Sequence, residues 1–167
     1  VYLAHLWHNT LNPSSTALPF MLDNLTPSTT APYLKQNLLE VGDRYYVDDS
    51  YTLANIPAEL DGAVWVMTAN ADRTNTSASY VSFDVDRPVT VYVAYDANAS
   101  AIPEWLHQTN GFSSSGMQLT GNGASLTSVF ELYSKDYPAG SVTGLGGNLA
   151  AGASGADSNY LVIIKPQ

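Results

Sequence analysis

Three residues in one short polar segment have side chains suited to holding a sugar. Trp105 lies between Glu104 and His107 in a segment that follows an Ile-Pro pair. A flat indole ring can stack on the apolar face of a sugar, and carboxylate and imidazole groups can hydrogen-bond its hydroxyls. We therefore expect Trp105 to be the best exposed platform for a carbohydrate. The alternative is that Trp105 closes one end of the fold beside its apolar neighbours, since large apolar side chains usually bury.

Other aromatic residues are secondary candidates for the same role. Tyr92 is expected on the polar face of a strand, and Tyr46 follows an early turn. Trp65 stands between two valines and is expected in the core instead.

Acidic residues at turns are the candidates for a metal site. Asp48 and Asp49 are adjacent at a predicted turn, and Ca²⁺ prefers carboxylate, carbonyl and water oxygens. The alternative is that these aspartates cap the turn, which Asp does well. The chain has no cysteine, so a thiolate-bound metal is excluded. His5 and His8 share a face only in a helix, which the surrounding prolines disfavour.

Catalytic motifs are missing from the sequence. Neither G-x-S-x-G nor G-x-x-x-x-G-K-[ST] occurs, and the four glutamates lie in no recognisable catalytic segment. We therefore expect a protein that is not an enzyme and that needs no cofactor, with Ca²⁺ as the one open possibility.

Composition narrows the partners. The 167 residues include 6 Lys+Arg and 15 Asp+Glu, which gives a net charge of −9. Such a surface repels nucleic-acid phosphates, so neutral polysaccharides or other copies of the chain are the expected partners. No apolar run is long enough for a transmembrane helix. Sparse Lys with abundant Asn, Ser, Thr, Gly and Tyr suggests a secreted, extracellular protein.

The elements that must position these residues are strands. In residues 80–96, YVSFDVDRPVTVYVAYD, apolar and polar residues alternate in two arms around Asp86-Arg87-Pro88. A period of two places one set on each face, so this segment predicts a β-hairpin with one apolar face. Residues 63–68 and 160–164 are almost wholly apolar and predict central strands. The expected core consists of Trp65, Val81, Phe83, Val85, Val89, Val91, Val93 and Ile163, all buried together.

At least eight short strands separated by turns predict an all-β fold. With no long helical pattern, we expect an antiparallel β-sandwich of jelly-roll type in residues 34–167. Residues 1–33 differ, because four prolines keep them from forming a helix, and we expect an extended N-terminal arm. The arm carries apolar side chains that we expect in self-association, unless it packs on its own domain: Leu3, Leu6, Trp7, Leu18, Phe20 and Leu22.

Four segments resemble a family of β-sandwich modules found in large secreted bacterial proteins. They are DGAVWVMTANADR, SYVSFDVDRPVTVYVAYD, IPEWL and ELYSKDYPAGSVTGLGGNLAAGASGADSNYLVII. The resemblance covers about residues 38–167 and is most specific over residues 61–96. It implies a non-catalytic accessory domain that accompanies polysaccharide-active or adhesive domains. Members often have Asp-Arg-Ser-Tyr where this chain has Asp48-Asp49-Ser50-Tyr51, which makes this corner more acidic here.

Two functions follow as competing hypotheses. One is a carbohydrate-binding or adhesive module, which does not need residues 1–33. The other is a self-assembling subunit of an extracellular filament or surface layer, joined through its arm by strand addition.

Overall fold

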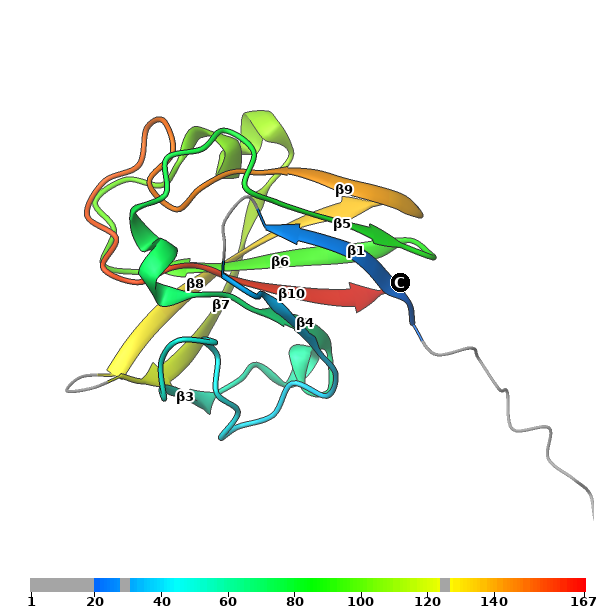
Figure 1. Ribbon diagram of the computed structural model, residues 1–167, viewed down its shortest axis with the longest axis horizontal. Coiled ribbons are helices and arrows are strands. Elements are labelled where there is room, and N and C mark those ends of the chain that lie inside the picture. Colours follow the sequence, from blue (N-terminus) through cyan, green and yellow to red (C-terminus); the bar gives the residue numbers. More distant parts are fainter. Residues whose placement is uncertain (1–19, 28–30, 124–126) are drawn as a thin grey trace, which may run out of the picture.

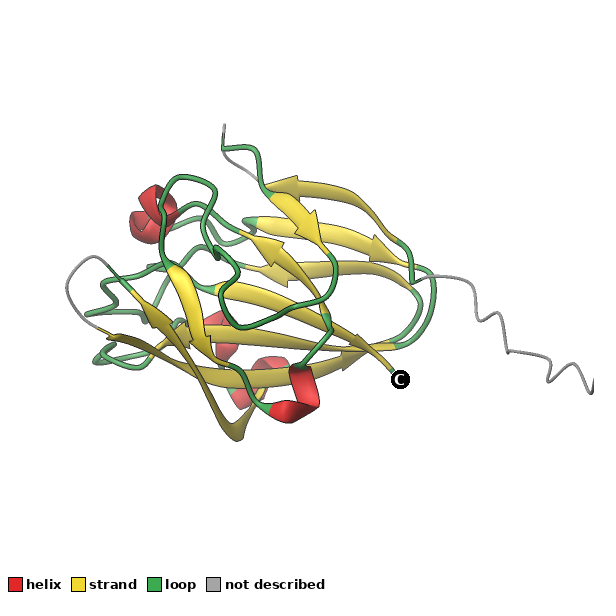
Figure 2. Cartoon of the chain, turned by 90° about the horizontal axis from the view of Figure 1, so that it is seen from below, coloured by secondary structure: helices red, strands yellow, loops and turns green. Residues whose placement is uncertain are grey.

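The computed structural model describes residues 20–27, 31–123 and 127–167, which form an antiparallel β-sandwich (Figures 1 and 2). The all-β prediction is therefore confirmed. The strands are β1 (Leu22–Pro27), β2 (Leu34–Gln36), β3 (Thr52–Asn55), β4 (Val64–Met67), β5 (Val81–Val85), β6 (Val89–Asp96), β7 (Ser113–Asn122), β8 (Thr127–Tyr137), β9 (Gly140–Leu145) and β10 (Leu161–Pro166). One sheet has three strands in the order β1-β5-β9, and the other has seven in the order β2-β4-β10-β6-β8-β7-β3.

Four short 3₁₀ helices connect the strands. They are η1 (Ala58–Leu60), η2 (Asn70–Thr74), η3 (Glu104–Leu106) and η4 (Gln108–Asn110). Within the described ranges, no helix has the length and apolar character needed to cross a membrane.

The first core lies between the two sheets. The predicted hairpin contributes Val81, Phe83 and Val85 from β5 and the alternate valines of β6, all buried. Because β5 belongs to the three-stranded sheet and β6 to the seven-stranded sheet, this hairpin joins the two layers (Figure 1). The predicted inward facing of these residues is confirmed.

A second core covers the other face of the seven-stranded sheet. Trp65 and Ile163, adjacent partners on β4 and β10, pack there with Ala94 of β6. Leu39, Leu53 and Leu60, together with Tyr45 and Tyr46, come from residues 39–60 and cover these strands. The expectation that Trp65 and Ile163 join the hairpin valines was therefore wrong. Both are buried, but strand alternation points them to the opposite face from Val66 and Val162.

Part of the expected arm belongs to the sandwich. β1 pairs antiparallel with β5, with Leu22 opposite Val85, and a β-bulge follows Asp23. Tyr33 is also buried in the first core. The three-stranded sheet thus begins before the domain boundary expected at residue 33, because its edge strand comes from residues 22–27.

Candidate functional site

Residues 103–111 form a compact double turn after β6. The N–H of Leu106 donates to the carbonyl of Pro103 (2.9 Å), and that of Asn110 donates to His107 (2.9 Å). Gly111 ends the turn with φ at 88°, a conformation that favours glycine. The Nζ of Lys135 on β8 donates to the Asn110 carbonyl (2.9 Å), so the turn is tied to the seven-stranded sheet.

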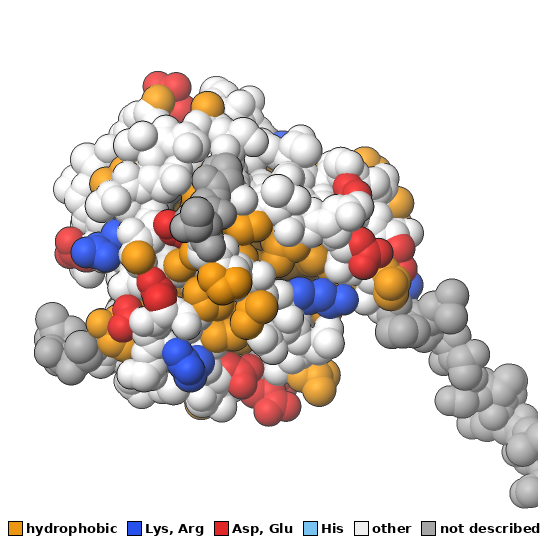
Figure 3. Space-filling view, viewed as in Figure 1, with side chains coloured by type: hydrophobic (Ala, Val, Ile, Leu, Met, Phe, Trp, Pro, Cys, Tyr) orange, Lys and Arg blue, Asp and Glu red, His pale blue; other side chains and the backbone are white. Residues whose placement is uncertain are grey.

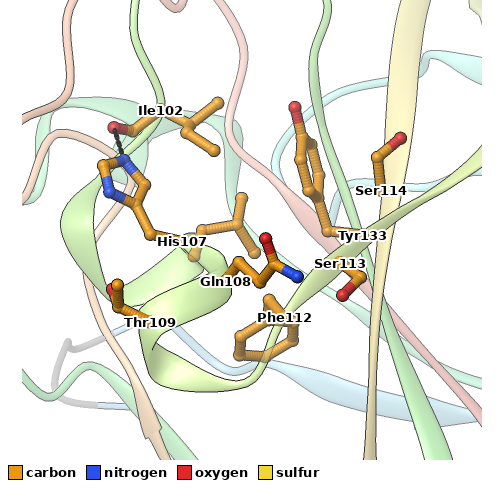
Figure 4. A pocket seen from close by; sticks show the side chains of 9 residues that line it. Ile102, His107, Gln108, Thr109, Phe112, Ser113, Ser114 and Tyr133 are labelled. Carbon is orange, nitrogen blue, oxygen red and sulfur yellow. Dashed lines mark hydrogen bonds between the residues drawn. The ribbon is translucent and has the colours of Figure 1, made fainter.

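A pocket of about 480 Å³ lies between this turn and strands β7 and β8 (Figure 4). Its apolar lining comes from Ile102, Leu106 and Phe112, of which the last two are buried. Tyr133 on β8 forms the facing wall. The lining therefore joins residues from three elements that are up to about thirty positions apart in sequence.

Polar side chains surround this apolar lining. Gln108, Thr109, Ser113 and Ser114 are exposed at the pocket, and Figure 4 shows the Gln108 amide lying between Phe112 and the two serines. An amide and three hydroxyls can both donate and accept hydrogen bonds. The pocket can therefore recognise a neutral ligand that carries several hydroxyl groups.

Tyr133 adds a partly buried ring to this wall. Burial, and next the charge of Glu131, raise the pKa of Tyr133, so its hydroxyl stays protonated at neutral pH and can donate. His107 lies at the opposite rim, where a ring nitrogen is 3.2 Å from the Ile102 carbonyl (Figure 4). This contact orients the imidazole beside the pocket.

A bulge in β7 shapes the pocket wall at the two serines. Ser114 pairs with Tyr133, but the next partners are Gln118 and Glu131, so β7 carries two extra residues. Ser115 Oγ donates to the Leu132 carbonyl (2.8 Å), and Gly116 has φ at 72°. Bulges commonly occur beside binding sites because they redirect side chains.

Trp105 lies on the other side of the double turn and is largely committed to packing. Its ring centroid is 5.8 Å from that of Phe112 and 5.3 Å from that of Tyr160, and its Nε1–H donates to the Gly147 carbonyl (3.1 Å). Trp105 and Glu104 also line a smaller pocket of about 260 Å³. The geometry favours the alternative in which Trp105 closes one end of the sandwich.

Tyr92 lies far from these residues in the fold. Its side chain is half-buried against the second core, on the opposite face of the seven-stranded sheet from the hairpin valines. Of the four expected sugar-binding residues, the structure thus brings together Glu104, Trp105 and His107 in one segment, and places His107 alone at the larger pocket.

Asp48 serves as a cap for η2. Its two carboxylate oxygens accept from the N–H groups of Asn70 (2.7 Å) and Ala71 (2.8 Å). Asp49 accepts from the Asn70 amide (3.0 Å). No group of three or more acidic, histidine or cysteine side chains within the described ranges is arranged to hold a metal. These contacts favour the capping role that was the alternative to a Ca²⁺ site.

Two of the residues expected in self-association pack within the chain. Leu22 is buried in the first core, and Phe20 packs partly against it, with the Arg87 guanidinium 6.0 Å from its ring centroid. For these two residues the structure replaces the expected intermolecular contact with an internal one, because β1 is a strand of the sandwich. Leu3, Leu6, Trp7 and Leu18 lie outside the described residues.

Sequence reasoning missed the residues of the larger pocket other than His107. Tyr133 alternates with Glu131 and Lys135 on β8, and this mixture of aromatic and charged residues on one strand face was a usable signal. Nothing in the sequence pointed to Gln108 or Ser113, since their meeting depends on the double turn and the β7 bulge.

Comparison with known proteins extends the fold assignment. No family model and no curated protein sequence matches the chain. A solved β-glucuronidase from glycoside hydrolase family 2 matches 86% of this chain with a TM-score of 0.73 and 18% identity, over 14% of its own length. A GH138 enzyme targeting pectin rhamnogalacturonan II matches 87% of this chain with a TM-score of 0.52 and 14% identity, over 16% of its length. These similarities show a shared fold, and the chain spans only a small part of both enzymes.

Proposed function

We propose that this chain is a non-catalytic, extracellular carbohydrate-binding module and that the pocket beside Tyr133 holds the sugar. The observation that carries the proposal is the combination of an aromatic wall, an apolar floor and several neutral polar side chains around one pocket of about 480 Å³. Small-ligand sites are typically apolar cavities of roughly 300–1,000 Å³ with a few polar groups that fix orientation.

The lining also indicates which ligands suit the pocket. None of the residues that line it is Asp, Glu, Lys or Arg. A neutral saccharide can exchange hydrogen bonds with Gln108, Ser113 and Tyr133, and its apolar face can pack on the Tyr133 ring. A uronic acid would find no cation among these lining residues, so neutral sugars are the proposed ligand class.

The same lining supports a binding role over hydrolysis. Most glycosidases use two carboxylates on either side of the scissile bond. The larger pocket has none, and the smaller pocket has Glu104 alone. The two fold neighbours act on carbohydrates through much longer chains, which supports a role for this fold as one module of such proteins.

The test is a glycan-array screen of the full chain, followed by calorimetric titration of the strongest neutral hit. Tyr133→Ala and Gln108→Ala should each weaken binding at least about tenfold, which corresponds to about 1.4 kcal/mol. Tyr92→Ala is the matched control, because it removes a half-buried tyrosine from the other face of the same sheet and should leave affinity unchanged.

Two results would overturn the proposal. One is the absence of binding to any glycan on the array. The other is wild-type affinity in both pocket variants, with near-ultraviolet circular dichroism confirming that they are folded. Release of sugar from the bound oligosaccharide, detected by chromatography, would contradict the non-catalytic part alone.

A further inference from the structure

The two sheets leave an apolar seam open along one side of the sandwich. β1 and β2 are the end strands of their sheets, and within the described part of the chain their outer edges pair with no strand. In the view of Figure 1, β2 and β4 lie beyond the β1 edge of the three-stranded sheet. Figure 3, from the same direction, shows hydrophobic side chains gathered over β2 and β4 and between them and β1.

Described residues on these three strands account for apolar surface at the seam. Leu34 on β2 is 46% exposed, although it lies opposite Met67 on β4. Leu25 on β1 and Val64 on β4 pack against the first core but are only partly buried. We define the open seam as Leu25, Leu34 and Val64. An exposed apolar surface beside unpaired strand edges is suited to receiving another extended segment.

Residues 1–8 have the composition of such a segment. The sequence VYLAHLWH contains Leu3, Leu6 and Trp7, and no Asp, Glu, Lys or Arg occurs in residues 1–19. The whole net charge of −9 therefore belongs to the remainder of the chain. Two sandwiches of like charge repel each other. An uncharged apolar segment is the part of this chain that can contact a neighbour without adding to that repulsion.

The start of the described chain indicates where this segment is directed. The N–H of Asp86 donates to the Met21 carbonyl (3.4 Å), so the chain joins the sandwich beside the turn between β5 and β6. Pro13 and Pro19 disfavour helix in the residues before this point. Residues 9–20, if extended, span roughly 40 Å, which is enough to reach a second molecule.

We propose that residues 1–8 of one copy bind in the open seam of a second copy. Trp7 and the leucines of the segment then bury against Leu25, Leu34 and Val64, and its backbone can pair with the free edge of β1 or β2. This contact joins unlike surfaces, so each copy still offers a free seam or a free segment to the next. The inference is independent of the carbohydrate pocket, which lies on other strands.

Sedimentation velocity of the full chain over a range of concentrations tests this contact. The wild-type protein should show an average mass that exceeds that of one chain and rises with concentration. Trp7→Asp and Leu34→Asp should each remain monomeric. Val41→Asp is the matched control, because Val41 is exposed (63%) but lies in a turn next to β3, and it should associate as the wild type does.

Mixing the two monomeric variants distinguishes a neighbour's seam from the chain's own. Trp7→Asp keeps an intact seam and Leu34→Asp keeps an intact segment, so an equimolar mixture should form a pair that neither variant forms alone. Thermal unfolding of each variant confirms that it is folded. The proposal is overturned if the wild type is monomeric at every concentration, if Trp7→Asp associates normally, or if the mixture stays monomeric.

Discussion

Buried tyrosine hydroxyls hold the loop between β9 and β10 against the sandwich. The bonds are Tyr46 to the carbonyl of Asn159 (2.5 Å), Tyr95 to that of Asn148 (2.7 Å) and Tyr160 to that of Gly146 (2.9 Å). The loop has little regular structure, so its carbonyls need side-chain donors where water is excluded. These tyrosines therefore act as structural donors.

Replacing Tyr95 by Phe should test this role. The Asn148 carbonyl would lose its donor, so the free energy of unfolding should fall by about 1–2 kcal/mol in urea titrations. Tyr137→Phe is the control, because the buried Tyr137 hydroxyl has no hydrogen-bond partner in the described structure. It should leave stability unchanged or raise it. Equal losses in both variants would contradict the assignment.

Alkaline pH should also weaken the fold through these residues. Burial raises the pKa of Tyr95 and of Tyr137 from 10.0 to about 12. Between these values the hydroxyl is ionised in the unfolded chain and protonated in the folded one, so the unfolded state binds fewer protons. The free energy of unfolding should therefore be insensitive to these groups below about pH 10 and fall as pH rises towards 12.

Urea titrations at pH 8, 10 and 11 measure this dependence. Tyr137→Phe should show a shallower decline between pH 10 and 11 than the wild type, since one of the titrating groups is gone. An equally steep decline in the variant would show that other groups cause the alkaline loss.

Among the elements, η2 depends on a side chain far away in sequence. The carboxylate of Asp48 accepts from the first N–H groups of this helix, which otherwise have no partner within it. Asp48 thereby links the turn before β3 to the segment after β4.

Asp48→Ala should therefore destabilise the protein by about 1–2 kcal/mol, in line with the loss of a helix cap. Asp49→Ala removes a single contact to the Asn70 side chain and should cost less. Differential scanning calorimetry with and without Ca²⁺ separates capping from metal binding. A rise in melting temperature with Ca²⁺ that is lost in both variants would instead support a metal site at these residues.

At the scale of the whole molecule, the seven-stranded sheet is shared by two cores. Val162 of β10 faces the first core, and Ile163 faces the second. Since one strand carries residues of both cores, neither should persist when the sheet unfolds.

Truncation in either core should consequently weaken one common transition. Phe83→Ala in the first core should cost about 3–5 kcal/mol, and Ile163→Ala in the second about 2–5 kcal/mol. Far-ultraviolet circular dichroism and the fluorescence of a variant that keeps Trp65 as its only tryptophan should give coincident unfolding midpoints. Separate midpoints would show that the second core unfolds by itself.

The amino-acid sequence alone determined the class of fold and the inward face of the hairpin. Alternation of period two depends only on strand geometry, so Val81, Phe83 and Val85 could be assigned to one face without knowing their partners. The apolar segments containing Trp65 and Ile163 predicted buried strands for the same reason. Alternation within one strand cannot say which layer covers each face, and the second core was therefore missed.

Tertiary structure decided the candidate site. Whether Trp105 stacks on a ligand or closes the sandwich depends on the positions of Phe112 and Tyr160, which come from other elements. The larger pocket needs the double turn at residues 103–111, the bulge in β7 and Tyr133 on β8 to meet at one place. Such contacts join residues that are distant in the chain and whose spacing carries no periodic signal. Local propensity can predict the strands, but the packing of one strand against another creates the pocket.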